Sequence, residues 1–405
     1  MLLFRALNNK TVLRLWLGQL GSAIGDEIYK IAFVWIAVGM IGSNTGYLAS
    51  IQLLAVLLFG ILGGRWSDRW NPYKTMMGVD LFRAFITLTP VICFYFHRPS
   101  FHVLVLSSVL IAGLGAFFEP AIQTSLPLLC EDRQTLKGAT GLMATTFRLA
   151  RVMGPAVIGL LSGLVATIHF FSINALSFLF SAYSVFTIHK KFPAHSSKNI
   201  EKEPILSNFI NSIRVLKKNK PLYDIVIAKT MTGGAWGLVY GLGIALLIHE
   251  VSPTDVKAFG FMMSAYGVGN VIAVLLVGNM QRKNPERMTY FGLLWLGLGF
   301  IGIAASRSFP LMLFFSAFTA IGGPLNDLPA TDIIQNEIPM KDMAKVFRLK
   351  MTLDNLAALI FMLISPLLFQ HFSIRTVIFW CGFLVVAYGV RGLTKKPIES
   401  VSIQP

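Results

Sequence analysis

Long apolar stretches alternate with short polar ones along the whole chain. A bilayer core about 30 Å thick needs roughly 20 apolar residues per helical span, and the pattern predicts twelve such spans. They cover residues 12–38, 47–66, 75–96, 101–124, 138–165, 168–188, 221–248, 256–279, 288–306, 309–330, 346–370 and 373–393. Because the spans use most of the 405 residues, we expect an all-α polytopic membrane protein without a large soluble domain.

Composition supports this class and argues against enzymes. Hydrophobic residues make up 55% of the chain and charged residues 13%, whereas an ordinary soluble protein has roughly a quarter charged residues. The three cysteines and seven histidines are scattered, without the spacing of a disulfide framework or a metal site. GLGFIG, from Gly297 to Gly302, matches a dinucleotide-binding pattern but lies inside an apolar span, where glycines serve helix packing. We therefore expect no enzyme activity, no cofactor and no metal.

Basic residues lie mainly in alternate loops. If the N-terminus is cytoplasmic, the inner segments hold 26 of the 35 Lys and Arg residues and the outer segments hold four. This bias predicts that both termini lie in the cytoplasm. The net charge of +16 then reflects topology and attraction to anionic lipid headgroups, and it gives no reason to expect nucleic-acid binding.

Two halves of the chain share three landmarks at offsets of 213, 212 and 211 residues. These pair Asn71-Pro72 with Asn284-Pro285, Gln123 and Pro127 with Gln335 and Pro339, and Pro155 with Pro366. Agreement among the offsets indicates a duplicated six-helix unit, as in transporters whose site lies between two repeats. We therefore predict an N-terminal bundle over residues 1–188, a cytoplasmic linker over 189–220 and a C-terminal bundle over 221–405.

The predicted linker is the longest polar interruption of the chain. Its second part has apolar residues at helical spacing opposite a polar face that ends in basic residues: Ile205, Leu206, Phe209, Ile210, Ile213 and Leu216. This pattern predicts an amphipathic helix on the inner membrane surface. The alternative is a plain flexible linker.

The turn GGRWSDRWNPYK, from Gly63 to Lys74, resembles the loop motif that follows the second helix of the major facilitator superfamily. Four residues stand at matching positions, namely Gly64, Asp68, Arg69 and Lys74. Asn71 and Pro72 depart from the motif, which has Gly and a basic residue there. The resemblance implies twelve helices in two pseudo-symmetric halves, with helices 1, 4, 7 and 10 lining a central cavity.

Further motifs resemble the branch of this superfamily that contains macrolide-efflux proteins and exporters of siderophores of the enterobactin or legiobactin kind. They are DLFRA from Asp80, FFEPAIQTSLPLL from Phe117, RLARVMGPAVIG from Arg148 and GGPLNDLPATDIIQNEIP from Gly322. Gly154 and Pro155 fit the helix 5 motif of exporters, although Ala150 and Ile158 replace two of its glycines. The alternative for this segment is a Pro-kinked packing helix with no bearing on transport direction.

Ionisable side chains inside a span cost roughly 3 kcal/mol or more unless they face a cavity or a partner. The candidates for substrate binding and proton coupling are Asp26, Glu27, Lys30, Glu119, Gln123, Lys229, Asn326 and Asp327. For Asp26 and Glu119 we expect a role as proton acceptors. The alternative for Asp26 is a structural pair with Lys30, which lies four residues away on the same helical face. Proton-coupled exporters that this chain resembles carry an Arg in helix 4, and this sequence has none there.

Charges near the inner ends of helices 3 and 5 suggest a gate. Asp68 and Asp80 would pair with arginines to close the cytoplasmic side, the arginines being Arg83, Arg148 and Arg151. The alternative is that these arginines extend to lipid phosphates. Together with Gly64, Arg69, Lys74, Gly154 and Pro155, they form the predicted conformational set.

These observations predict a secondary active transporter that exports a small amphipathic molecule, a siderophore or a drug, by proton-coupled alternating access. Its partners would be the small-molecule substrate, protons and membrane lipids, and we expect a monomer. One alternative is a nutrient uptake symporter of the same fold. Another is a non-transporting membrane sensor or scaffold.

Overall fold

The computed structural model describes most of the chain. The described residues are 2–66, 70–97, 100–130, 132–192, 213–214, 216–217, 220–278, 280, 284–338 and 340–394. Only the backbone is described at residues 2–4, 61–66, 97, 221, 340–342, 344–345 and 348. Within these ranges the chain forms helices and connecting turns, without a strand. Most of the predicted amphipathic helix, residues 205–216, lies outside them.

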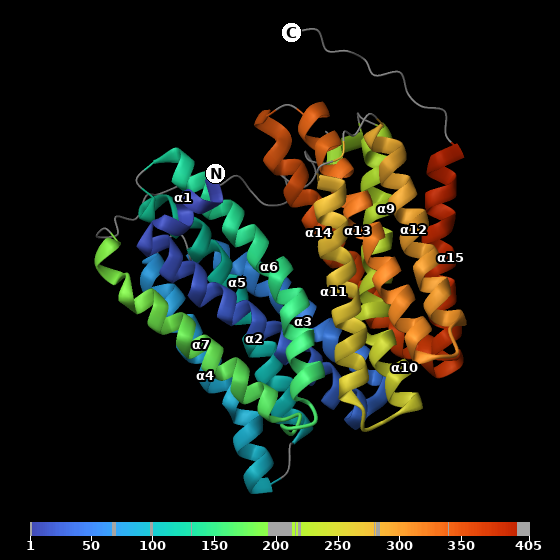
Figure 1. Ribbon diagram of the computed structural model, residues 1–405, viewed down its shortest axis with the longest axis horizontal. Helices are drawn as coiled ribbons and strands as arrows, with labels where there is room; N and C mark the ends of the chain where they lie inside the picture. Colours follow the sequence, from blue (N-terminus) through green and yellow to red (C-terminus); the bar gives the residue numbers. More distant parts are fainter. Residues whose placement is uncertain are drawn as a thin grey trace. The chain divides into compact units, whose positions relative to one another are not determined.

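Helices of the first part of the chain are long enough to cross a bilayer, apart from three short ones (Figure 1). In order they are α1 (Leu2–Asn8), α2 (Lys10–Ile41), η1 (Gly42–Asn44), α3 (Thr45–Trp66), α4 (Pro72–His97), α5 (Phe101–Leu129), α6 (Arg133–Leu161) and α7 (His169–Thr187). The short helix η3 (His189–Lys191) follows α7.

The second part is built in the same way. Its helices are α9 (Lys220–Leu238), η4 (Val239–Gly243), α10 (Ile244–Val251), α11 (Val256–Gly278), α12 (Pro285–Ala305), α13 (Phe309–Glu337), α14 (Met340–His371) and α15 (Ile374–Thr394). The short η4 has π-helical hydrogen bonding and separates α9 from α10. Such π turns are frequent at functional sites.

Every predicted span lies on a helix, and this confirms the all-α polytopic class. Among the described residues, 11 stretches are long and apolar enough to cross a membrane. The first of them, Lys10–Gly60, joins two predicted spans because α2, η1 and α3 follow one another directly. Between these helices the chain turns at Gly42, whose φ of 56° falls in the left-handed region that glycine adopts without strain.

The helices form two compact units. The first unit contains Met1–Ile200 and Ile244–Ser264, and the second contains Glu201–Gly243 and Ala265–Pro405. Residues 244–264, which hold α10 and the start of α11, thus pack with the first part of the chain. Our predicted division at 189–220 stays a prediction.

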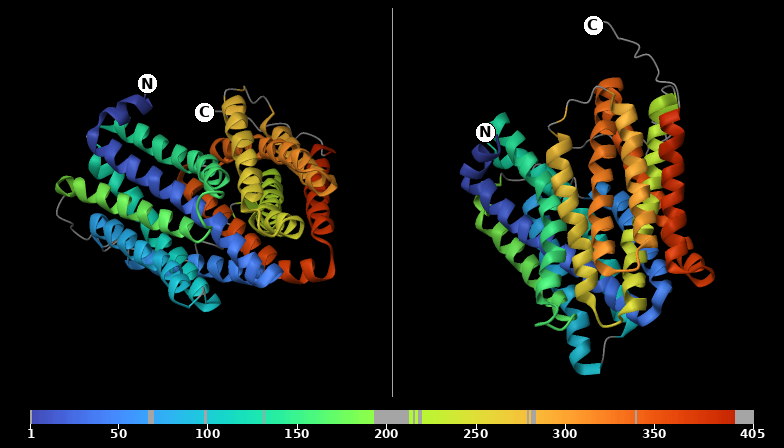
Figure 2. Two further views of the ribbon diagram at one scale, coloured as in Figure 1. Left: turned by 60° about the horizontal axis from the view of Figure 1, so that its bottom comes forward. Right: turned by 45° about the vertical axis from the view of Figure 1, so that its right-hand side comes forward.

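Within the first unit, α2 packs against α6 and α7, while α4 packs against α5 and α7 (Figures 1 and 2). Helix α6 approaches α2 closely at Gly154, where an added Cβ would lie 2.5 Å from the Glu27 Cβ. Trp35 of α2 contacts the ring of Phe259 at 6.0 Å between centroids. The small residue in the Gly154-Pro155 motif therefore serves close helix packing, as its sequence context predicts.

Within the second unit, α12 packs against α13 and α15, and α9 packs against α14. A Cβ added at Gly297 would lie 2.7 Å from the carbonyl oxygen of Gly382, and one at Gly302 would overlap the Phe315 ring. These contacts confirm that GLGFIG is a packing segment. Side chains over the Gly297–Gly302 segment leave no room for a dinucleotide.

The predicted repeat landmarks occupy matching elements. Asn71 precedes α4 and its side-chain oxygen accepts a hydrogen bond from the Tyr73 N–H at 3.0 Å. Asn284 is the N-cap position of α12, with Pro285 in the first turn. Pro155 lies inside α6, and Pro366 lies inside α14. Helices α4 and α6 thus correspond to α12 and α14.

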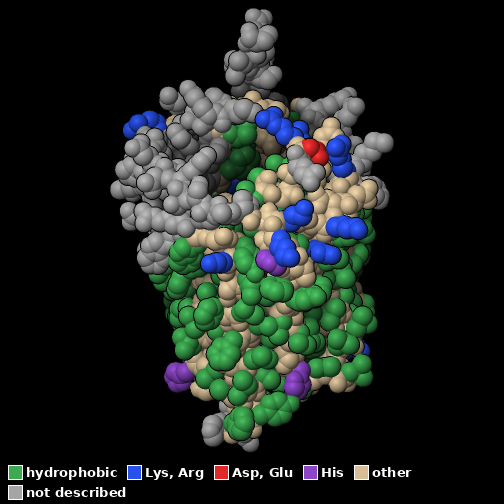
Figure 3. Space-filling view, turned by 90° about the vertical axis from the view of Figure 1, so that its left-hand side faces the viewer, with side chains coloured by type: hydrophobic (Ala, Val, Ile, Leu, Met, Phe, Trp, Pro, Cys, Tyr) green, Lys and Arg blue, Asp and Glu red, His purple; other side chains and the backbone are tan. Residues whose placement is uncertain are grey.

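Large apolar side chains are exposed on the outer faces of the helices. Phe96 is 75% exposed, Leu160 72% and Leu176 66%, which in water would be costly. Figure 3 shows a broad hydrophobic belt on one face, with most Lys and Arg side chains gathered at one end of it and His side chains at both ends. The described surface is that of a multi-pass membrane protein.

Candidate functional site

The first unit encloses a charged cavity of about 210 Å³. Its polar lining comes from four helices and consists of Gln19, Ser22, Asp26, Arg83, Glu119 and Thr146. The structure therefore brings together Asp26 and Glu119, which we predicted as coupling residues, and Arg83, which we predicted as a gating residue. We refer to this group as the Arg83 cavity.

Helix α2 presents a polar stripe to the Arg83 cavity. Gln19, Ser22 and Asp26 are spaced by three and four residues, so they lie on one face of an otherwise apolar helix. Sequence analysis singled out the charge and missed its two neutral neighbours. Their helical spacing was the signal that could have found them.

Arg83 is the central group of the cavity. Its Nη1 lies 3.9 Å from the Asp26 Oδ2, and its Nε donates to the Ile111 carbonyl oxygen at 3.4 Å. The guanidinium lies 4.9 Å from the centre of the Phe178 ring, within the range of a cation–π contact. A Cβ at Gly115 would come within 2.5 Å of the Arg83 Nη2, so glycine makes room for this side chain. Arg83 thus supplies from α4 the guanidinium that α5 lacks.

Glu119 is exposed toward the Arg83 cavity and has one partner on its own helix. The Gln123 Nε2 donates to its Oε1 at 3.0 Å. These two predicted residues therefore act as a pair one helical turn apart. The amide fixes the orientation of the carboxylate without neutralising its charge.

The alternative that we considered for Asp26, a structural pair with Lys30, is not formed. Lys30 instead forms an ion pair with Glu27, three residues away, at 2.7 Å, while Asp26 faces Arg83 from another helix. The reason is tertiary, because a guanidinium across the cavity competes with a local ammonium that is 62% exposed. Glu27 also packs beneath Gly154, so the Glu27–Lys30 pair belongs to the contact between α2 and α6.

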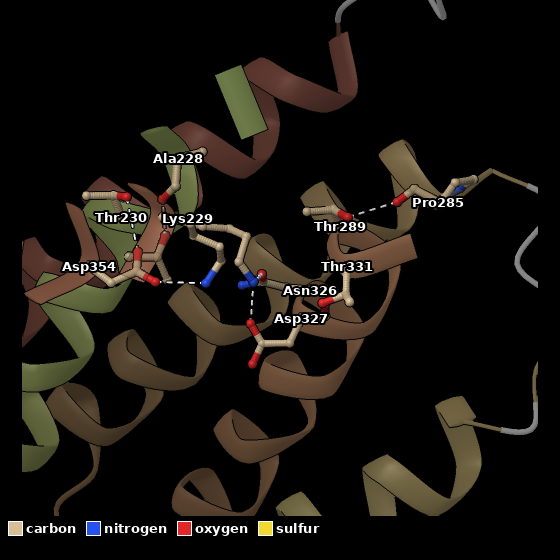
Figure 4. Close-up of polar contacts among 11 residues, drawn as sticks. Ala228, Lys229, Thr230, Pro285, Thr289, Asn326, Asp327, Thr331 and Asp354 are labelled. Carbon is tan, nitrogen blue, oxygen red and sulfur yellow. Dashed lines mark hydrogen bonds and ion pairs between the residues drawn. The ribbon is translucent and has the colours of Figure 1, made fainter. Parts of the chain in front are cut away.

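A second polar group lies in the second unit. Lys229 on α9 is buried, and its Nζ donates to the Asn326 Oδ1 at 2.8 Å and pairs with the Asp327 carboxylate on α13 (Figure 4). The Lys229 side chain is 6% exposed and that of Asp327 is 69% exposed. The three residues that we predicted on spans 7 and 10 are therefore in contact, and we name them the Lys229 cluster.

Three polar residues that we did not predict as site residues lie beside the Lys229 cluster. Asp354 on α14 accepts hydrogen bonds from Lys350 at 2.8 Å and from the Thr230 hydroxyl at 3.1 Å (Figure 4). Thr230 follows Lys229 in sequence, so α9 contacts both carboxylates with consecutive residues. The spacing of Lys350 and Asp354, four residues apart at the start of a predicted span, was a usable signal.

The remaining predicted gating residues do not converge in the described part of the chain. Asp68 and Arg69 lie outside it, Gly64 is described by its backbone alone, and Lys74 is exposed. Asp80 is completely buried. The predicted gating residues Arg148 and Arg151 form no ion pair with any residue whose side chain is described. The gate stays a prediction.

The chemistry available in the two polar groups is binding of protons and of charged ligands. Within the described residues, His, Cys, Asp and Glu side chains do not form a group of three or more that could hold a metal ion. Both groups combine acidic and basic side chains with amides or hydroxyls. Aromatic rings beside Arg83 add an apolar wall, as small-molecule sites of transporters need.

Comparison with known families gives the class of protein. Residues 3–318 match the family described as "Transmembrane secretion effector", and residues 244–403 match "Major Facilitator Superfamily". The chain therefore belongs to the transmembrane secretion effector family of major facilitator transporters. The predicted resemblance is confirmed.

Several curated relatives of the chain are efflux proteins. It is 22% identical to Macrolide efflux protein A of Streptococcus pyogenes over 388 residues, covering 93% of each chain. It is also 23% identical to Multidrug efflux pump Tap of Mycolicibacterium fortuitum, covering 76% of each chain. These similarities support a role in transport, efflux and drug resistance.

Solved structures share the fold. The chain resembles a bacterial homologue of the iron transporter ferroportin with a TM-score of 0.74 at 13% identity, covering 95% of this chain and 99% of that one. It resembles the nucleoside transporter NupG with a TM-score of 0.71 at 12% identity, covering 95% and 98%. At this identity the likeness concerns the fold alone.

Proposed function

We propose that this transporter exports a small amphipathic organic molecule from the bacterial cytoplasm by proton-coupled alternating access. The observation that carries the proposal is the Arg83 cavity, where two carboxylates and one guanidinium face an enclosed space inside a membrane bundle. Charges in such a place are expensive and mark a path for ions or substrate. The efflux proteins among its relatives support the outward direction.

The cargo is a drug of the macrolide kind or a siderophore. The cavity combines Phe118 and Phe147 with Asp26 and Glu119, so it offers apolar contact together with a net negative charge. In the second unit, the Lys229 cluster adds a buried ammonium, which suits an acidic group of a cargo. A cationic cargo group would therefore match the Arg83 cavity of the first unit, and an acidic cargo group would match the Lys229 cluster of the second.

We propose that the protein is a monomer in the cytoplasmic membrane with both termini in the cytoplasm. Its basic loops would contact anionic lipid headgroups. The support is the distribution of Lys and Arg among the predicted loops. We further propose that Asp68, Arg69, Lys74, Arg148 and Arg151 serve the inner gate. The support for the gate is the loop motif and the position of the two arginines on helix α6.

Everted membrane vesicles from cells that produce the protein test this function. A proton gradient with the acidic side inside should drive uptake of erythromycin or of a catecholate siderophore. Glu119→Gln should abolish the pH-driven part because it removes a carboxylate from the cavity, whereas Glu250→Gln, at an exposed position, should leave it intact. Unchanged flux in Glu119→Gln would remove Glu119 from the mechanism.

The other candidate functions give different outcomes in the same assay. A nutrient symporter would accumulate its substrate in intact cells and would deplete it from acidified everted vesicles. A sensor or scaffold would give no flux with any substrate. Either result would contradict export.

A further inference from the structure

Asp80 is a buried acid that the export mechanism above leaves unused. It lies about two turns from the start of α4. The residue is 0% exposed, and neither carboxylate oxygen has a hydrogen-bonding partner among the described residues. An ionised carboxylate in such surroundings is strongly disfavoured, and the group binds a proton instead.

Charged and polar groups from three helices face this carboxyl. Arg83 lies one turn further along α4, Asp26 approaches from α2, and the Ser181 hydroxyl adjoins it from α7. The Ser181 oxygen accepts a hydrogen bond of 3.0 Å from the Gln19 amide, so its own O–H remains available to the Asp80 carboxylate. From α5, which also packs against α4, Glu119 faces the cavity that Arg83 lines. The ionised form of Asp80 thus has two donors within reach.

Two of these neighbours connect Asp80 with the Arg83 cavity. Arg83 and Gln19 both line the cavity, and each also lies next to Asp80 directly or through Ser181. The acid is therefore buried, yet it is only one side chain away from the enclosed space. A proton that enters the cavity has a short route to it.

Arg83 is held loosely enough to change partners. Its contact with Asp26, at 3.9 Å, and its hydrogen bond to Ile111, at 3.4 Å, are both long. Its guanidinium also lies over the rings of Phe178 and Phe118, at 4.9 and 6.0 Å from their centres. Asp80 lies three residues before Arg83 on the same helix, so the two side chains can meet on one helical face.

We propose that Asp80 is a proton-binding site of the transport cycle and that Arg83 exchanges between Asp26 and Asp80 according to the protonation of Asp80. With a proton on an Asp80 oxygen, Arg83 pairs with Asp26, as in this structure. When Asp80 releases the proton to water, its carboxylate draws the guanidinium away, and Asp26 becomes free to bind a cationic group of the cargo. This inference rests on the proposed function, and it adds to the carboxylates of the cavity a proton-binding residue outside the cavity wall.

The surroundings favour a proton over a metal cation. Hard cations bind several oxygen ligands at once, whereas Asp80 has a single carboxyl group and one adjoining hydroxyl. The nearby guanidinium would also repel a cation that cannot be neutralised. A proton needs only one oxygen atom and forms a neutral acid.

Infrared difference spectra of the full-length protein in proteoliposomes, recorded between acidic and alkaline pH, test the site directly. The wild type should show the carbonyl band of a protonated carboxyl group that titrates, and this band should be lost in Asp80→Asn and kept in Glu250→Gln. If Asp80→Asn does not fold, Asp80→Glu retains the titrating group and should shift the band. A titrating band that stays unchanged in either Asp80 variant would overturn the inference.

Transport separates failure of this inference from failure of the proposed function. Erythromycin uptake into acid-loaded proteoliposomes should lose its dependence on the pH gradient in Asp80→Asn. Gradient-driven uptake at the wild-type level in that variant would overturn the role of Asp80 while leaving proton-driven export intact. If the wild type shows no gradient-driven uptake, the proposed function fails, and the infrared titration still decides whether Asp80 binds a proton.

Discussion

Asp327→Asn should destabilise the protein more than Lys229→Met, because the two partners of this ion pair are buried to different extents. The Lys229 side chain is 6% exposed, whereas that of Asp327 is 69% exposed. Removing the carboxylate leaves a buried ammonium with the Asn326 Oδ1 at 2.8 Å and without its counter-charge. Removing the ammonium leaves a carboxylate that water can solvate.

The magnitude follows from the same asymmetry. Breaking a fully buried ion pair by removing one partner costs about 3–5 kcal/mol. Since Asp327 is mostly exposed and Asn326 remains bonded to Lys229, we expect about 2 kcal/mol for Asp327→Asn. For Lys229→Met we expect about 0–1 kcal/mol, as for an exposed pair. At about 2–4 °C per kcal/mol for a unit of 150–250 residues, Asp327→Asn should lower Tm by about 4–8 °C.

Thermal unfolding of the purified protein in one detergent measures these differences. The double variant Lys229→Met with Asp327→Asn should unfold close to Lys229→Met alone, because the buried charge is then absent. Glu250→Gln controls for loss of a carboxylate at an exposed position. Equal Tm values for the two single variants, or additive losses in the double variant, would refute the burial argument.

Three other predictions concern packing, pH and gating. Gly154→Val should cost roughly 1–3 kcal/mol by overpacking α6 against α2, seen as a lower Tm, whereas Gly60→Ala, whose Cβ meets no atom within 4 Å, should not. The pKa of Asp132 lies below its ordinary value because the side chain and backbone of Thr135 donate hydrogen bonds to its carboxylate, with a smaller contribution from Arg5. Asp132 therefore stabilises the N-terminus of α6 fully at any pH above that ordinary pKa. The Tm gap between wild type and Asp132→Ala should therefore close as pH falls through the lowered pKa, and a constant gap would contradict this. Asp68→Asn should reduce drug efflux from cells, and unaltered efflux would remove Asp68 from the gate.

Hydropathy predicted the transmembrane architecture because the cost of burying backbone and charge in lipid dominates every other term. All twelve predicted spans lie on helices, and the landmarks at Pro155 and Pro366 fall in corresponding ones. The short helix α1 and the π turn η4 were not predicted. α1 is too short to give a hydropathy signal, and a π turn depends on packing around Tyr240, whose hydroxyl contacts Ser316.

The partners of the intramembrane charges could be predicted only in part. Their position inside apolar spans selected the charged residues, whereas the contacts among Lys229, Asn326 and Asp327 were not predicted. Spacing alone favoured the wrong partner for Lys30, because it carries no information on which helix lies opposite Asp26. The role of Arg83 in the cavity depends on the contact of α4 with α5 and α7, which no local pattern contains.

The central claim, proton-coupled export, is tested most directly by flux across an imposed pH gradient with the purified protein in liposomes. With an acidic interior and the membrane potential clamped at zero, molecules inserted with their cytoplasmic face outward should accumulate erythromycin or a catecholate siderophore while protons leave. Collapse of the gradient with a protonophore should release the cargo. Accumulation that is the same with and without the pH gradient would contradict the account.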